Sequence, residues 1–248
     1  MAIEPNSFEF NLFYAITIIV MVIKVILIVF LAKKMYDRKK ETGKITYGFI
    51  TSVFVLFLCL LVSRILYFYF DFYLTKFDPN KYYTYPAIIV WKIALFISMI
   101  GYANFLFVID QKVLGFKFKG VFSYAIIIFA SIGVLYPVNS EKDFEFISIL
   151  FLVANVVAIV IPIVFFYIGT KAVEYRIAAY LVAIGVILYA IGANIINEFM
   201  FVIWVDMFGT QMRLVVYFLA LIFKTSGLIL FAYGITDFVK KFTEKKIQ

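Results

Sequence analysis

The chain has 248 residues, of which 65% are hydrophobic and only 15% are charged, and its formal net charge is +8. Soluble domains are roughly 45–50% apolar, and so few charges could not cover this much apolar surface in water. There is no histidine and one cysteine, Cys59, which excludes histidine-ligated haem, histidine-based zinc sites, cysteine–histidine catalysis and an internal disulfide.

Apolar runs of helix length recur along the whole chain. About 20 residues at roughly 1.5 Å rise each cross a hydrocarbon core of about 30 Å. We therefore expect an all-α polytopic membrane protein in which residues 1–248 form a single domain of seven transmembrane helices. The expected helices cover 10–32, 47–74, 85–110, 121–138, 146–169, 177–201 and 212–236.

Basic residues between these runs predict the orientation. Fifteen Lys and Arg residues follow the first, third, fifth and seventh helices, whereas four lie on the opposite side. Because cytoplasmic loops carry the excess of Lys and Arg, the N-terminus is expected outside and the C-terminus in the cytoplasm, in the plasma membrane. The positive charge then reflects topology and contact with membrane lipids, and not binding of nucleic acid.

Proline and glycine indicate how two of the helices are shaped. Pro162 lies well inside the fifth helix and should kink it, because proline removes a backbone donor and clashes with the preceding turn. Gly185 and Gly192 are seven residues apart in the sixth helix and share a face with Ala178. Small residues on one face allow a neighbouring helix to approach closely.

A weak internal repeat relates the third and seventh helices. WKIALFISMIGYANFLF aligns with FLALIFKTSGLILFAY when Ala94 is set on Ala220, Leu95 on Leu221, Gly101 on Gly227 and Phe105 on Phe231. These pairs are 126 positions apart. At a spacing of 127 positions, Asp71-Phe72 aligns with Glu198-Phe199. If the match is real, helices one to three and five to seven are copies, and the fourth helix links them.

Ionisable side chains at membrane depth cost roughly 2.5–3.5 kcal/mol each on insertion scales, and they usually pair or line a cavity. In this chain, several ionisable side chains lie on the same helix face as other polar side chains. Lys24, near the expected cytoplasmic end of the first helix, should snorkel toward the cytoplasm. The remaining candidates are predicted to converge in the outer half of the bundle. They are Arg64, Tyr67 and Asp71 (i, i+3, i+7), Trp91 and Lys92, Asn194, Asn197 and Glu198 (i, i+3, i+4), and Lys224.

Two interpretations of these residues stay open. In one, surplus positive charge forms an outward-opening pocket for a carboxylate or phosphate ligand, which arginine can bind through two hydrogen bonds. In the other, Arg64 and Lys92 pair with Asp71 and Glu198 in an internal salt-bridge network that only fixes helix packing.

Lys224, in the middle of the seventh helix, resembles the lysine of microbial rhodopsins that carries retinal as a Schiff base. In that family a carboxylate of the third helix serves as counterion. The third helix here has Lys92 and no acidic residue before Asp110, and the sixth has neither tryptophan nor proline. Retinal on Lys224 is therefore an alternative, and otherwise no cofactor and no metal are expected.

A second resemblance covers more of the chain. The segment GTKAVEYRIAAYLVAIGVILYAIGANIINEF is similar to the seven-helix membrane sensor regions of prokaryotic histidine kinases and of free-standing archaeal relatives. The Trp91-Lys92 pair and the spacing of Arg64 and Asp71 are similar as well. The resemblance implies a receptor-like or accessory sensor that signals through a separate partner protein, because no kinase segment is present.

A transporter and an enzyme are the alternatives to the sensor. The faint repeat favours a small transporter of three-plus-one-plus-three helices. An enzyme is not expected, because histidine, deep paired carboxylates and a metal-ligand cluster are missing from the sequence. Catalysis by Asp71 and Glu198 is the enzymatic alternative.

Overall fold

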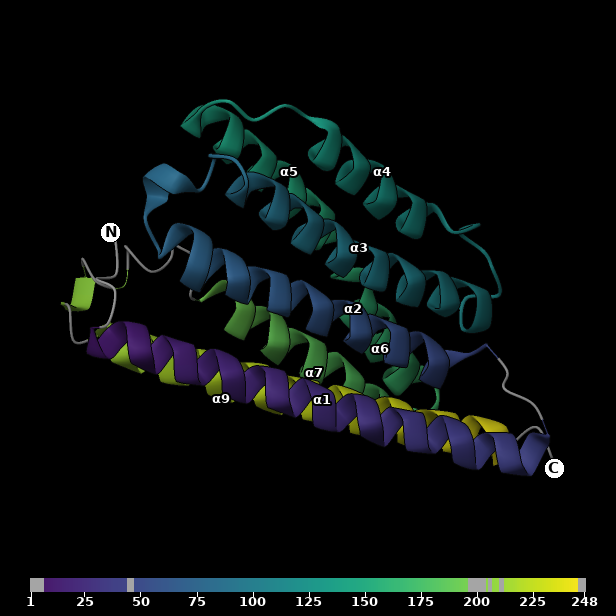
Figure 1. The fold of residues 1–248 in the computed structure, drawn as a ribbon. Helices are drawn as coiled ribbons and strands as arrows, with labels where there is room; N and C mark the ends of the chain where they lie inside the picture. The colour runs from purple at the N-terminus through teal and green to yellow at the C-terminus, as the bar shows by residue number, and fades with distance from the viewer. Residues whose placement is uncertain (1–6, 44–46, 196–203, 205–206, 210–211, 245–248) are drawn as a thin grey trace. The chain divides into compact units, whose positions relative to one another are not determined.

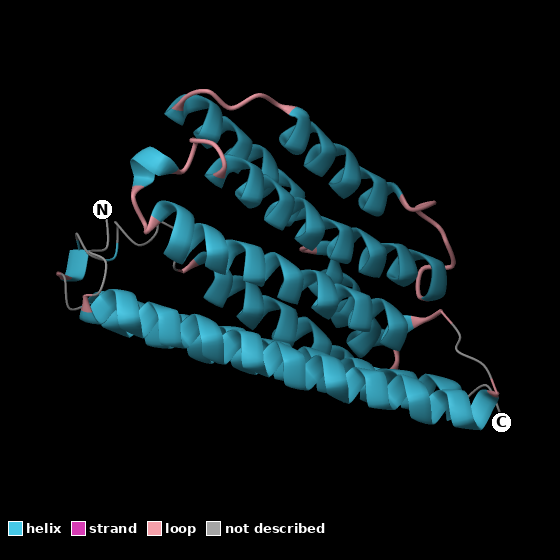
Figure 2. Ribbon diagram, viewed as in Figure 1, coloured by secondary structure: helices cyan, strands magenta, loops and turns pink. Residues whose placement is uncertain are grey.

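The computed structural model describes residues 7–43, 47–195, 204, 207–209 and 212–244. These residues form helices joined by turns, with no β-strand among them (Figure 2). The helices are α1 (Phe8–Thr42), α2 (Phe49–Tyr69), α3 (Ala87–Lys112), α4 (Val121–Leu135), α5 (Glu141–Val157), α6 (Val160–Lys171), α7 (Arg176–Asn194) and α9 (Met212–Glu244).

Five helical segments among the described residues are long and apolar enough to cross a membrane. They are Phe8–Lys40, Phe49–Thr75, Ala87–Lys112, Val173–Asn194 and Met212–Lys241. The all-α class and the membrane character expected from the sequence are therefore confirmed. The fourth and fifth predicted spans correspond to shorter helices, because α4 has 15 residues and the fifth span is divided between α5 and α6.

The first helix extends further than predicted. Ser7 starts α1 by accepting a hydrogen bond from the Phe10 N–H at 3.1 Å. The helix then continues ten residues past the expected end at 32, through a charged segment, and stops at Gly43. Gly43 adopts a left-handed conformation (φ 73°), and its N–H donates to the Lys39 carbonyl. The sequence estimate ended α1 where hydrophobicity ends, but the helix itself ends at a glycine C-cap.

The fifth predicted span is interrupted. A turn at 158–159 separates α5 from α6, and Pro162 follows within the first turn of α6. Pro162 cannot donate to the carbonyl four residues earlier, and its ring clashes with that carbonyl, which belongs to Ala158. The kink predicted from Pro162 is confirmed as a complete break in the helix.

The chain divides into two compact units. Unit 1 contains residues 1–10 and 28–160, and unit 2 contains residues 11–27 and 161–248. In unit 1, α3 packs against both α2 and α4, and α4 packs against α5 (Figure 1). In unit 2, α7 runs along α9. The helix α1 contributes its central part to unit 2 and its C-terminal part to unit 1.

Glycines set the closest helix contacts in unit 2. A Cβ on Gly185 would lie 2.6 Å from the Phe231 backbone nitrogen, and one on Gly192 would lie 2.8 Å from the Lys224 backbone nitrogen. Ala178, on the same face of α7, is fully buried. The predicted small-residue face of α7 is confirmed, and its partner is α9.

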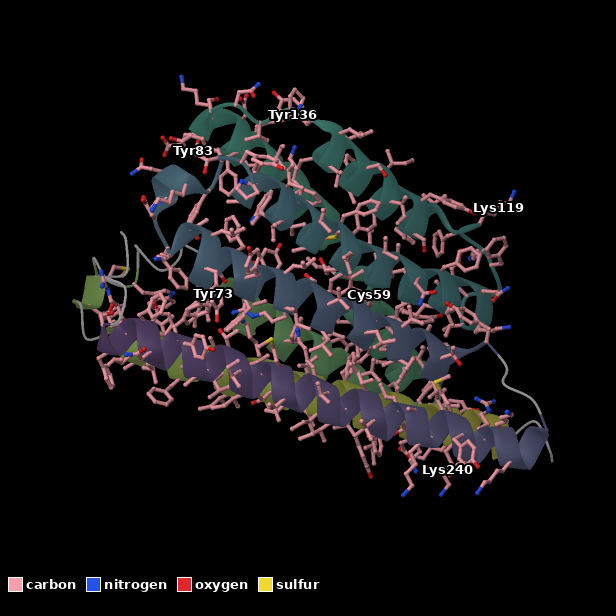
Figure 3. All side chains as sticks on the ribbon, in the orientation of Figure 1. Cys59, Tyr73, Tyr83, Lys119, Tyr136 and Lys240 are labelled. Carbon is pink, nitrogen blue, oxygen red and sulfur yellow. The ribbon has the colours of Figure 1, made fainter. Side chains whose placement is uncertain are left out.

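A glycine also sets the contact between α2 and α3 in unit 1. A Cβ on Gly101 would lie 2.9 Å from the Cβ of Cys59, which Figure 3 labels on α2. Cys59 is half-buried and forms no disulfide. It is a small packing residue of an apolar helix.

Candidate functional site

The predicted site residues fall into both units, so the contacts of each group are described within its own unit. In unit 1, Arg64 and Asp71 form an ion pair, with 3.8 Å between Nη1 and Oδ2. Asp71 lies in η1 (Phe70–Thr75), a π-helical extension of α2. Tyr67, one turn after Arg64 on the same helix, is half-buried. The i, i+7 spacing therefore brings arginine and aspartate together, which is one of the two pairs of the salt-bridge interpretation.

Lys92 binds the C-terminal end of α4. Its Nζ donates to the carbonyls of Val134 at 3.3 Å and Tyr136 at 2.5 Å, and the side chain is only 9% exposed. The last carbonyls of a helix have no partner within the helix and carry partial negative charge, which a lysine stabilises. Lys92 is therefore a capping residue that fixes the turn after α4, which contains Tyr136 (labelled in Figure 3).

Trp91 packs against α5. The centroid of its ring lies 4.7 Å from that of Phe144 and 5.8 Å from that of Phe151. Trp91 and Lys92 thus hold α5 and the end of α4 against α3. Both contacts are packing interactions of unit 1.

The polar face predicted for the sixth helix is described only in part. The Asn194 side-chain amide donates to the Ala190 carbonyl of its own helix at 2.8 Å, and this side chain is exposed. Asn197 and Glu198 lie outside the described residues.

Two lysines belong to the helices of unit 2. Lys24 of α1 is 3% exposed, and its Nζ lies 5.9 Å from the centroid of the Tyr189 ring on α7. Lys224 of α9 is half-buried, and its backbone adjoins Gly192, one turn after Tyr189. Lys24 of α1 and the backbone of Lys224 of α9 therefore both lie beside the turn of α7 that contains Tyr189 and Gly192.

The snorkelling expected of Lys24 stays a prediction. The helix α1 continues 18 residues beyond Lys24, to Thr42, and its last ten residues form a charged segment. Lys24 is therefore central in its helix. The buried Thr17, two turns earlier on the same face, adds a hydroxyl to this side of α1. Sequence reasoning missed Thr17, and the signal that could have identified it is its spacing of seven residues from Lys24 on one helix face.

The helices around these lysines contain no acidic residue in their apolar segments. Residues 11–27, 161–171, 176–194 and 212–236 include no Asp or Glu, while they include Lys24 and Lys224. Like charges in a medium of low dielectric disfavour one another, and an anion favours both. A carboxylate or phosphate group has the chemistry that ammonium groups with nearby hydroxyls bind best.

The carboxylate of Asp110 on α3 organises a turn. It accepts hydrogen bonds from the N–H groups of Phe118 at 3.1 Å and Gly120 at 2.6 Å, and it is buried. These bonds order the connection from α3 to α4. This acid thus has a local structural role at the end of its helix.

These features define an all-helical protein with several helices able to cross a membrane, and with two lysines inside one of its units. Among the described residues, no group of three or more Cys, Asp or Glu side chains is arranged to hold a metal ion. No protein-family model, curated protein or solved structure matches the chain. The resemblances to sensor regions and to rhodopsins therefore stay predictions.

Proposed function

We propose that this protein is a receptor-like or accessory membrane sensor that binds a small anionic ligand in unit 2 and signals through a partner protein. The ligand group is a carboxylate or a phosphate, either free or in a lipid headgroup. Lys24 and Lys224 bind it, and the hydroxyls of Thr17, on the Lys24 face of α1, and of Tyr189 are candidates for further contacts. The protein resides in the plasma membrane with its N-terminus outside.

The burial of Lys24 is the observation that carries this proposal. A lysine 3% exposed at the centre of a long apolar helix is costly, and such residues usually mark a binding or transport function in membrane proteins. Lys224 adds a second positive charge to the same three-helix unit. A bound anion would offset both charges. The cation–aromatic contact with Tyr189 supplies about 0.5–2 kcal/mol.

Signalling would use α1. This helix of 35 residues has no break, and at roughly 1.5 Å per residue it is about 50 Å long. It holds Lys24 in unit 2, while residues 28–42 belong to unit 1. A ligand that shifts Lys24 therefore shifts a rigid helix whose end carries a cluster of basic residues suited to a partner protein.

Thermal unfolding in nanodiscs tests the site. Inorganic phosphate and benzoate, added to protein in neutral phosphatidylcholine, represent free ligands, and phosphatidylglycerol in the disc represents a headgroup. At 100 times Kd a ligand stabilises the folded state by about 2.7 kcal/mol. We expect an increase in the unfolding midpoint with one of these probes, and loss of the increase in Lys24→Met and Lys224→Gln.

Lys240→Gln is the matched control, because Lys240 (labelled in Figure 3) is an exposed lysine of the same helix as Lys224 and lies 16 residues after it. It should keep the full response. Equal midpoints with and without every probe, or an unchanged response in folded Lys24→Met, would contradict the proposal.

A small transporter is the second candidate, and the packing of the two long helix pairs favours it. Gly101 sets the contact between α2 and α3, and Gly227, its partner in the sequence alignment, sets the contact between α7 and α9. Repeated units are common in secondary transporters. Uptake of labelled phosphate or benzoate into proteoliposomes would identify transport, whereas binding without uptake under imposed gradients would argue for the sensor.

A further inference from the structure

The turn between α3 and α4 alternates exposed phenylalanine and lysine side chains. Residues 116–119 read Phe-Lys-Phe-Lys, and all four are exposed. The rings of Phe116 and Phe118 are 41% and 42% exposed, which water disfavours. Lys112 adds a third exposed lysine, and residues 111–140 include no Asp or Glu. The turn therefore presents apolar rings and positive charge on one short segment.

Hydrogen bonds to Asp110 fix the backbone of this turn. The buried carboxylate accepts from the N–H groups of Phe118 and Gly120, and the Asp110 carbonyl accepts from the Phe116 N–H at 2.7 Å. The Phe116 carbonyl accepts in addition from the Lys119 N–H at 3.2 Å. The rings and lysines are therefore carried by an ordered backbone.

Two residues of the turn adopt a backbone conformation that favours glycine. Phe116 and Lys119 (labelled in Figure 3) have φ of 61° and 50°. Their neighbours Gly115 and Gly120 have φ of 63° and 75°. Glycine enters this left-handed region readily, whereas a residue with a Cβ is strained there, and such strain clusters at ligand-binding sites. The chain thus places a ring and an ammonium group at two positions where glycine would be more stable.

Each ring of the turn packs on one helix and is open on its other side. Phe116 contacts Phe107 of α3, with 5.8 Å between ring centroids. Phe118 contacts Phe122 of α4, with 5.1 Å between centroids. These contacts orient both rings, while their exposed sides are available for a further apolar contact.

An exposed apolar stripe of α4 begins at the turn. On the inner face of this helix, Ile126 and Ala130 are fully buried. The residues of the other face recur at helical spacing and are all exposed: Val121, Tyr124, Ile128, Ile132 and Leu135. An apolar stripe with lysines at one end matches a phospholipid, whose acyl chains are apolar and whose headgroup is charged.

The length of α3 predicts the depth of the turn in a bilayer. This helix is long and apolar enough to cross a membrane, and its 26 residues at roughly 1.5 Å each extend about 39 Å. A bilayer with its headgroup regions is about 40–45 Å thick, so the turn that follows Lys112 would lie among the headgroups. In the orientation expected from the sequence, this is the cytoplasmic leaflet, whose surface potential is negative.

We propose that the turn between α3 and α4 is a binding site for the headgroup of an anionic phospholipid. Lys112, Lys117 and Lys119 bind the phosphate, since each ammonium group donates up to three hydrogen bonds. Phe116 and Phe118 insert at the boundary between headgroups and acyl chains, and the acyl chains cover the stripe of α4. The site lies within unit 1, so it is independent of the anion site proposed in unit 2.

Quenching by brominated lipids tests the lipid selectivity. Tyr124→Trp, in a background of Trp91→Phe and Trp204→Phe, places the single tryptophan on the exposed stripe of α4. Bilayers of phosphatidylcholine with increasing dibrominated phosphatidylglycerol then give the binding constant of the anionic lipid relative to phosphatidylcholine. Each lysine near an anionic surface favours binding by about fivefold. We expect a preference of about fivefold or more, and of less than about twofold when Lys117→Gln and Lys119→Gln are combined.

Lys81→Gln combined with Lys142→Gln is the matched control, because both are exposed lysines of unit 1 outside the turn. This variant should keep the full preference. Equal binding of the two lipids by the parent protein, as for a turn that binds an acidic protein instead, would overturn the proposal. So would an unchanged preference in the variant with Lys117→Gln and Lys119→Gln, once circular dichroism shows it to be folded.

Asp110→Asn separates an organised site from simple charge attraction. An asparagine amide accepts through one oxygen only, so one of the two N–H groups of the turn loses its partner. If the turn must be ordered to bind the headgroup, the preference should fall by about twofold or more. If charge alone attracts the lipid, removal of a negative charge should raise the preference. A higher preference in folded Asp110→Asn would therefore overturn the site.

Discussion

The contact between α7 and α9 makes a quantitative prediction for Gly227→Ala. The new Cβ would lie 2.5 Å from the Tyr189 backbone nitrogen and 2.7 Å from the Gly185 carbonyl oxygen. Atoms in ordinary contact are about 3.5–4.0 Å apart. Because both neighbours are helix backbone, they cannot rotate away, and the two helices must separate by about 1 Å.

The cost of this separation follows from packing. Overfilling a packed interior costs about 1–3 kcal/mol, and we take the upper end because a gap of about 1 Å also forfeits roughly half of the dispersion energy across it. Alanine stabilises a helix interior by about 0.8–1 kcal/mol relative to glycine. The variant should therefore be destabilised by about 2 kcal/mol.

Reversible unfolding in mixed micelles with increasing dodecyl sulfate, followed by circular dichroism, measures this free energy. Gly133→Ala in α4 is the matched control, because the three atoms nearest to its new Cβ belong to the ring of Phe151, a side chain that can rotate. It should cost less than about 1 kcal/mol. If Gly227→Ala were as stable as the wild type, or no less stable than Gly133→Ala, the backbone contact between α7 and α9 would be refuted.

Three further variants separate structural roles from ligand binding. Lys92→Met leaves two helix-end carbonyls without their ammonium donor, so it should lower the unfolding free energy by about 2–3 kcal/mol in the same assay. Hydrogen bonds from the Asn139 backbone N–H and the Ser140 hydroxyl lower the pKa of the Asp143 carboxyl from 3.8. Its ionised form therefore stabilises the fold above that pH, and the stabilisation is lost as the pH falls through the lowered pKa, so Asp143→Asn should show a smaller loss of melting temperature between pH 6 and pH 3. Purified protein mixed with retinal should give no visible absorption band, and a band abolished by Lys224→Ala would establish the rhodopsin alternative.

Periodicity and small residues predicted the parts of the structure that depend on one helix alone. Arg64 and Asp71 meet because they lie two turns apart on one helix. The glycine face of α7 is readable because only glycine and alanine allow backbone contact in an apolar helix. Both features could be obtained from spacing without knowledge of any neighbouring helix.

Contacts between helices were not predictable in the same way. Helices that are apolar all round give no periodic signal of which face is buried. The partner of Lys92 is a pair of carbonyls more than 40 residues away, and carbonyls leave no mark in a sequence. The end of α1 was misplaced because it depends on the Gly43 C-cap, and not on the loss of hydrophobicity at residue 33.

Lys92 and Lys24 are both buried lysines, but their surroundings differ. The ammonium of Lys92 meets the negative end of α4, so its burial is explained within unit 1. Lys24 lies over the Tyr189 ring and shares unit 2 with Lys224, so an anion bound there would favour the charged form of both lysines.

A bound anion can supply that negative charge, and so can Glu198, and Glu198→Gln tests the second source. If a ligand balances the lysines, this variant should keep the ligand-dependent increase in the unfolding midpoint and lose little stability without ligand. If Glu198 balances them, the variant should lose about 3–5 kcal/mol, as expected when one partner of a buried pair is removed. In that case the lysines form an internal ion network, and the proposed anion site in unit 2 is refuted.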